Sequence, residues 1–124
     1  KLIGPPSRSE AWGTGFIPKE CLGDISRARG IADGIDTVSV RHVSGGWSTL
    51  QFKSYERGRE KWQGTAKHVI WLDEEPPMDV YMEGFTRTLE TGGLVYLTFT
   101  PLKGMSDVVS MFLSDTESEM LQAA

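Results

Sequence analysis

Residues 68–77 decide the fold, and they read His68-Val69-Ile70-Trp71-Leu72-Asp73-Glu74-Glu75-Pro76-Pro77. The apolar run of residues 69–72 predicts a strand that is buried on both faces, as in a parallel sheet. The run stops at three acids and two prolines, so carboxylates gather where the strand ends. In open α/β sheets this edge is where ligands bind.

A buried strand that ends in Asp-Glu is typical of the Walker B motif of enzymes that cleave nucleotide phosphates. Asp73, at the strand tip, would hold a hydrated Mg²⁺ that bridges the β- and γ-phosphates, and Glu74 would orient and deprotonate the attacking water. Neighbouring side chains point apart along an extended chain, so the two acids need not compete for one ligand. The structural alternative is a solvated acidic turn before a helix, where acids are also favourable.

A second buried strand is predicted at residues 93–101, and it ends in hydroxyl side chains followed by a proline. Between the two strands, residues 78–91 carry apolar side chains at helical spacing, and Gly92-Gly93 predicts the end of that helix. A strand, a helix and a second strand form a right-handed crossover, which places Asp73, Glu74 and Thr98 to Thr100 at one edge of one sheet. A hydroxyl at that edge could sense the γ-phosphate.

Together these residues resemble the large subunit of tailed-phage and prophage terminases, the ATP-driven motor that packages DNA into procapsids. The likeness is weak before about residue 50 and runs through Trp62-Gln63-Gly64, Val69 to Pro76, Glu83 to Arg87 and Leu97 to Gly104. It implies that Asp73 is the magnesium-binding acid and Glu74 the catalytic glutamate. It also implies that Thr98 and Thr100 lie in the segment that couples hydrolysis to movement, with Thr100, before Pro101, the better candidate.

The sequence has no P-loop of the form G-x-x-x-x-G-K-[ST], whose backbone amides cradle phosphates. In the family this loop precedes the stretch seen here and a nuclease domain follows it. Residues 1–124 are therefore expected to be a partial ATPase domain, an internal piece that holds the Walker B and coupling segments. By themselves they should neither bind ATP tightly nor hydrolyse it.

The resemblance also implies cofactors, partners and a location. ATP and Mg²⁺ would be bound in the complete motor, which acts in the host cytoplasm and not at a membrane. Its partners would be the small terminase subunit, the portal protein, double-stranded DNA and neighbouring large subunits.

Charge and composition exclude several other classes. A net charge of −4 and a pI near 5.1 argue against a dedicated nucleic-acid-binding module, because neutralising phosphates needs clustered lysine and arginine. The single cysteine excludes an internal disulfide, and no apolar run approaches the roughly 18 residues of a membrane span. Arg57 and Arg59, in the basic stretch 56–67, and Arg87 are candidate phosphate or DNA contacts. The structural alternatives are a solvated charged helix for the stretch and pairing with Glu83 for Arg87.

The first half of the chain is predicted from local patterns. Residues 18–29 are expected to form a short helix that Pro18 opens. Residues 36–43 and 48–55 alternate between polar and apolar, and the glycines of residues 44–47 predict a hairpin turn between them. Trp47 and Trp62 could stack on bases, with core packing as the alternative.

We therefore expect an α/β, three-layer fragment like a P-loop NTPase of the ASCE class, with a mostly parallel sheet and an antiparallel hairpin at residues 36–55. The expected function is to supply the Mg-binding and water-activating acids of a viral DNA-packaging ATPase. Two alternatives stay open. One is a helicase-like P-loop ATPase, which shares the Asp-Glu strand, and the other is a non-catalytic interaction domain derived from a motor, whose acids would face a basic partner.

Overall fold

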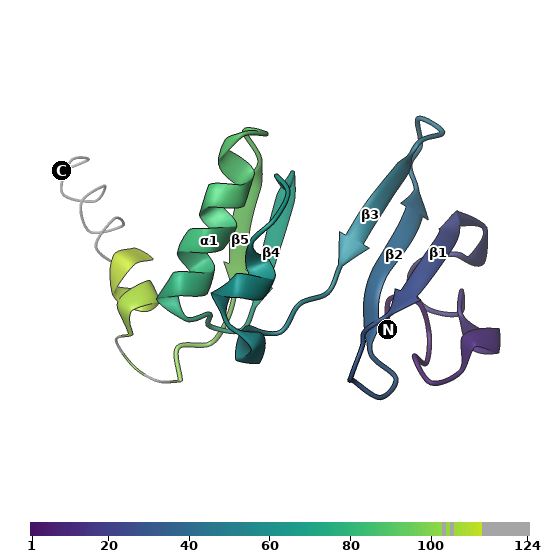
Figure 1. Cartoon of the computed structure of the whole chain (residues 1–124), viewed down its shortest axis with the longest axis horizontal. Coiled ribbons are helices and arrows are strands. Elements are labelled where there is room, and N and C mark those ends of the chain that lie inside the picture. The colour runs from purple at the N-terminus through teal and green to yellow at the C-terminus, as the bar shows by residue number, and fades with distance from the viewer. Residues whose placement is uncertain (103, 105, 113–124) are drawn as a thin grey trace. The chain divides into compact units, whose positions relative to one another are not determined.

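The computed structural model describes residues 1–102, 104 and 106–112, and it leaves the side chain of Arg57 undescribed. The chain divides into two compact units, residues 1–53 and 54–124, and each is described by itself (Figure 1). The described residues contain an α-helix together with antiparallel and parallel strands, so the predicted α/β class is confirmed. Among the described helices, none is long and apolar enough to cross a membrane.

The first unit contains a three-stranded antiparallel sheet in the order β1-β2-β3, formed by Leu22–Arg27, Ile35–Arg41 and Trp47–Gln51. A 3-10 turn at Ser9–Ala11 precedes it. Strands β2 and β3 are the predicted hairpin, in which Val38 pairs with Leu50. Gly45 supplies a φ of 90° in the connecting turn, and the amide of His42 donates to the carbonyl of Gly46 at 2.8 Å.

The helix predicted for residues 18–29 is wrong. Only a single 3-10 turn forms, at Lys19–Cys21, and strand β1 follows it directly. Strand β1 pairs with β2, which gives its backbone the hydrogen-bond partners that a helix would otherwise supply. Gly23, Asp24 and Ser26 are weak helix formers, so local propensity does not hold these residues in a helix.

The second unit contains the predicted crossover. Strand β4 covers Val69–Asp73, helix α1 covers Met78–Leu89, and strand β5 covers Leu94–Thr98. The two strands are parallel, in a register that runs from the pair Val69 and Leu94 to the pair Asp73 and Thr98. Residues 107–112 are also helical.

The core of this unit lies between the sheet and the helix. Ile70 and Leu72 of β4 and Val80 of α1 are buried, with exposed fractions of at most 7%. Tyr55 and Trp62 pack against them, which confirms packing as the role of Trp62. They come from two short 3-10 turns, Tyr55–Arg57 and Arg59–Trp62, that meet at Gly58, where φ is 73°. The charged helix expected here is therefore wrong, because a positive φ breaks helical geometry.

The prediction that β4 is buried on both faces is also wrong for the residues described. Helix α1 covers one face of the parallel strands, as Figure 1 shows. On the other face Val69, Trp71 and Leu94 have exposed fractions of 55 to 58%. The described part of the chain supplies no second helical layer there, so the three-layer, P-loop NTPase-like arrangement stays a prediction. The prediction of a mostly parallel sheet is wrong for the described residues, which form a parallel sheet of two strands and an antiparallel sheet of three, because β1 extends the hairpin.

Candidate active site

The ends of β4 and β5 bring Asp73 and Thr98 side by side. The hydroxyl of Thr98 donates to Oδ1 of Asp73 at 2.9 Å, and the indole Nε1 of Trp71 donates to the Thr98 hydroxyl at 2.8 Å. An indole nitrogen can only donate, so the hydroxyl proton of Thr98 is left for the carboxylate. Trp71, Thr98 and Asp73 thus form one series of hydrogen bonds, in which Thr98 and Asp73 are 25 positions apart in the sequence.

The carboxylate of Asp73 is accessible and oriented. Its side chain lies at the exposed carboxyl edge of the parallel strands, and Thr98 fixes one of its two oxygens. The described residues contain no group of three or more His, Cys, Asp or Glu that could hold a metal ion without other ligands. Mg²⁺ commonly binds through one or two carboxylates plus substrate phosphates and water. Asp73 therefore fits a magnesium ion that arrives with a phosphate substrate.

Glu74 occupies an unusual backbone conformation. Its φ is 63°, in the left-handed region, where a side chain with a Cβ is disfavoured by about 1–2 kcal/mol. Its amide donates to the carbonyl of Thr98 at 2.8 Å, which extends the pairing with β5 by one residue. The side chain is exposed. The turn thus presents a carboxylate to solvent immediately beside Asp73.

Tyr55 lies beneath this turn, and no sequence motif marks it. Its hydroxyl contacts the carbonyl oxygens of Asp73 and Glu74 at 2.8 Å and 3.1 Å. Burial, followed by the nearby carboxylates of Asp73 and Glu74, raises the pKa of Tyr55 to about 12. The phenol therefore stays protonated at neutral pH and acts as a donor to the backbone.

The structure brings Thr98, and not Thr100, to the acids. The hydroxyl of Thr98 contacts Asp73 directly. Thr100 is exposed, and its carbonyl accepts from the amide of Leu102 at 2.7 Å. Among the described contacts, none joins the Thr100 side chain to Asp73 or Glu74. The register of the two strands therefore brings Thr98, and not Thr100, into contact with Asp73.

Among the described contacts, none joins Arg59 or Arg87 to the two acids. Arg87 donates through Nη1 to the carbonyl of Gly64 at 2.7 Å, and its Nε lies 3.4 Å from Oε1 of Glu83. The predicted pairing with Glu83 is therefore confirmed. Arg59 is exposed in its 3-10 turn, and the side chain of Arg57 lies outside the described residues. Their contacts with phosphate or DNA stay predictions.

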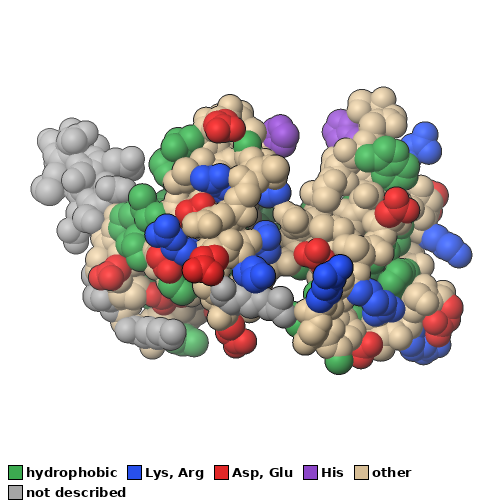
Figure 2. Space-filling model, in the orientation of Figure 1, with side chains coloured by type: hydrophobic (Ala, Val, Ile, Leu, Met, Phe, Trp, Pro, Cys, Tyr) green, Lys and Arg blue, Asp and Glu red, His purple; other side chains and the backbone are tan. Residues whose placement is uncertain are grey.

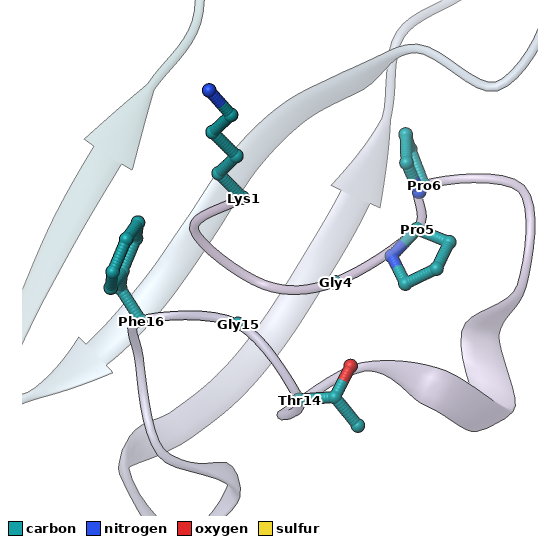
Figure 3. A pocket seen from close by; sticks show the side chains of 7 residues that line it. All are labelled: Lys1, Gly4, Pro5, Pro6, Thr14, Gly15 and Phe16. Carbon is teal, nitrogen blue, oxygen red and sulfur yellow. The ribbon is translucent and has the colours of Figure 1, made fainter.

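Two hollows in the surface are lined by other residues. One, of about 330 Å³, is lined by Arg87, Glu90 and residues 64–66 and 86. The other, of about 550 Å³, lies in the first unit and is lined by Lys1, Phe16 and small or proline residues at 4–6, 14 and 15 (Figure 3). Neither contains Asp73 or Glu74. On the face seen in Figure 2, acidic and basic side chains are interspersed over the surface, without one large patch of either sign.

Comparison with known proteins decides the family. The family described as "Terminase large subunit, T4likevirus-type, N-terminal" matches residues 8–123. The chain belongs to the terminase large subunit family. This confirms the resemblance seen in the sequence at the level of the family, and it sets aside a helicase outside that family.

Two terminase large subunits illustrate the relationship. The subunit of Salmonella phage P22 is 42% identical over 119 residues, which cover 92% of this chain and 24% of that protein. The subunit of Enterobacteria phage LP7 is 50% identical over 68 residues, which cover 55% of this chain and 14% of that protein. The chain thus spans about a quarter or less of these terminase relatives. No solved structure matches it significantly.

Proposed function

We propose that this terminase chain supplies the acids for ATP hydrolysis in a motor that packages viral DNA. Asp73 holds Mg²⁺, Glu74 activates the attacking water, and Thr98 relays the state of the nucleotide. In this proposal residues 1–124 are the part of the ATPase domain that carries the Walker B and coupling segments. ATP, Mg²⁺ and a P-loop supplied by other residues complete the site.

The observation that carries the proposal is the hydrogen bond from Thr98 to Asp73. It joins the predicted metal-binding acid to the predicted coupling segment at the carboxyl edge of two parallel strands. Ligands of open α/β sheets bind at that edge. A purely structural acidic turn would cap the following helix, but Asp73 takes its hydrogen bond from β5. In the first turn of α1 the amide of Val80 donates instead to Oδ1 of Asp79, at 2.9 Å.

The chemistry follows from the positions of the side chains. Mg²⁺ would neutralise the charge that develops on the phosphate oxygens. Thr98 leaves one oxygen of Asp73 free of protein hydrogen bonds within the described residues, and that oxygen is available as the ligand. Glu74 is exposed next to it, so its carboxylate can accept a proton from a water that attacks the γ-phosphate.

The partners proposed for the complete motor are double-stranded DNA, the portal protein, the small terminase subunit and neighbouring large subunits, in the host cytoplasm. Arg59 and Arg87 are the described candidates for phosphate or DNA contacts. Arg59 is the more available, since Arg87 already contacts Gly64 and Glu83.

The test is Glu74→Gln in a complete large subunit that contains these residues. We expect ATP turnover to fall by several orders of magnitude, because an amide cannot accept the proton, while ATP binding is preserved. Glu75→Gln is the matched control, since it makes the same chemical change one residue later. It should retain turnover within a few-fold.

Three results would change the proposal. If Glu75→Gln abolishes turnover and Glu74→Gln does not, the water-activating role moves to Glu75. If neither variant affects turnover, the acids have no catalytic role. If a double change of Asp73 and Glu74 weakens the binding of a basic partner without any effect on nucleotide, the interaction-domain alternative is correct.

A further inference from the structure

The direction of the Glu74 carboxylate depends on its backbone. Within the described residues its side chain makes no hydrogen bond or ion pair, so no neighbouring side chain orients it. Its backbone is in the left-handed region, with φ of 63°. Strained residues of this kind persist only where surrounding contacts hold them, and they cluster at functional sites.

Both peptide groups that flank the Cα of Glu74 are held by hydrogen bonds. The group before it is bound at its carbonyl by Tyr55 and at its amide by the carbonyl of Thr98. The group after it is bound at its carbonyl by the same Tyr55 hydroxyl. Peptide groups are planar, so fixing the two planes fixes φ and ψ of the residue between them. The Cα–Cβ direction of Glu74 is fixed with them.

Tyr55 can perform this task because its own position is fixed. Its ring stacks on Trp62, with centroids 5.9 Å apart and an interplanar angle of 28°. Both rings pack on the core formed by Ile70, Leu72 and Val80. At the start of its 3-10 turn, the side chain of Ser54 accepts from the amide of Glu56 at 3.2 Å. The hydroxyl thus reaches the turn from a rigid base.

We propose that Tyr55 is a positioning residue of this site, which holds the Asp73–Glu74 turn and thereby aims the Glu74 carboxylate at the attacking water. The proposal rests on the proposed function, in which Glu74 activates water. Tyr55 acts only through the backbone and touches none of the reacting atoms. Its hydroxyl shares one proton between the carbonyls of Asp73 and Glu74.

The experiment is Tyr55→Phe in a complete large subunit that contains these residues, with steady-state ATP hydrolysis as the readout. Phenylalanine keeps the ring that stacks on Trp62 and packs on the core, so only the hydroxyl is lost. We expect kcat to fall about 10- to 100-fold, because a misplaced catalytic group costs rates of this order. The KM for ATP should change less than about threefold, because Tyr55 does not touch the nucleotide.

Tyr81→Phe is the matched control. Tyr81 also packs against the core, and its hydroxyl makes no hydrogen bond in the described part of the chain. Its kcat and KM should equal those of the wild type. A merely structural role of Tyr55 would lower the melting temperature and the fraction of active protein, which lowers the apparent kcat at unchanged KM. Melting and the fraction of ATP-binding sites are therefore measured alongside, and kcat is expressed per active site.

The outcomes separate the two proposals. If Tyr55→Phe retains kcat within twofold of wild type while Glu74→Gln abolishes turnover, the role of Tyr55 is wrong and the proposed function stands. If Glu74→Gln itself keeps turnover, the proposed function is wrong and the Tyr55 role is overturned with it. In a double variant, Tyr55→Phe should add nothing to Glu74→Gln, because both remove the same interaction with water.

A second variant serves if Tyr55→Phe does not fold. Trp62→Phe leaves the Tyr55 hydroxyl in place but reduces the ring surface on which Tyr55 stacks. We expect a several-fold lower kcat at unchanged KM. An unchanged kcat in this variant would overturn the proposal.

Discussion

The two sheets of this chain pair and connect their strands in different ways. Strands β2 and β3 are joined by a short hairpin and run antiparallel, so neighbouring strands end at opposite edges. Strands β4 and β5 are joined through helix α1 and run parallel, so both end at the same edge. Only the second arrangement collects the last residues of two strands, and these residues are Asp73 and Thr98. The candidate chemistry therefore follows from the topology.

Glycine serves the two connections differently. In the hairpin, Gly45 has a φ of 90° and an added Cβ would meet open space, so conformation is what requires glycine. At the entry to β5, an added Cβ on Gly93 would lie 2.3 Å from the carbonyl oxygen of His68, so space is what requires it. A side chain at position 45 would therefore strain only its own backbone. A side chain at position 93 would clash with the neighbouring backbone at His68.

Three substitutions test this comparison of the two sheets, and the largest effect is expected for Gly93→Ala. The clash with His68 must push the strands apart, and overpacking of this kind destabilises by about 1–3 kcal/mol. Chemical denaturation of the chain measures it. The matched control is Gly84→Ala in helix α1, where the new Cβ would lie 3.5 Å from Ile70. That control should be neutral or stabilise by up to about 1 kcal/mol, because alanine favours helices. Equal stabilities of the two variants would contradict the close approach at Gly93.

The second largest effect is expected for Thr98→Val, which keeps the shape of the side chain and removes the donor to Asp73. We expect ATP turnover in a complete subunit to fall about tenfold, or about 1.4 kcal/mol, because one hydrogen bond to a charged group is lost. Thr100→Val makes the same change two residues later. A larger loss in that variant than in Thr98→Val would return the coupling role to Thr100.

The smallest effect is expected for Gly45→Ala in the hairpin. A Cβ in the left-handed region costs about 1–2 kcal/mol, and the lower entropy of the unfolded alanine chain offsets about half of it. Gly46→Ala should be close to neutral, since its nearest neighbour would be the Ser44 hydroxyl at 3.6 Å. Thermal melting distinguishes the two, and a destabilising Gly46→Ala with a neutral Gly45→Ala would reverse the assignment.

Much of the second unit could be predicted from the sequence. The apolar run at 69–72, the helical spacing after Pro77 and the second apolar run before Thr98 each indicate one element, and their order predicts the parallel crossover. For residues 22–27 the sequence predicts a helix instead of the observed strand, because Pro18 is typical of the first position of a helix. Its strand character depends on pairing with β2, which is a tertiary effect.

The candidate site was predictable only in its acids. Asp73 and Glu74 follow a recognisable strand, and the register of β4 and β5 then selects Thr98 over Thr100. Nothing in the local pattern around Tyr55 shows that its hydroxyl reaches a turn 18 residues away. The left-handed backbone conformation of Glu74 could not be predicted from the sequence either, because glutamate rarely adopts it. Contacts between distant segments decide both features.

The measurement that tests the central claim most directly is the rate of ATP hydrolysis by the Glu74→Gln subunit, compared with its Glu75→Gln counterpart at saturating ATP. We expect Glu74→Gln to bind ATP and to hydrolyse it several orders of magnitude more slowly than Glu75→Gln. Equal rates in the two variants would contradict the assignment of Glu74 as the residue that activates water.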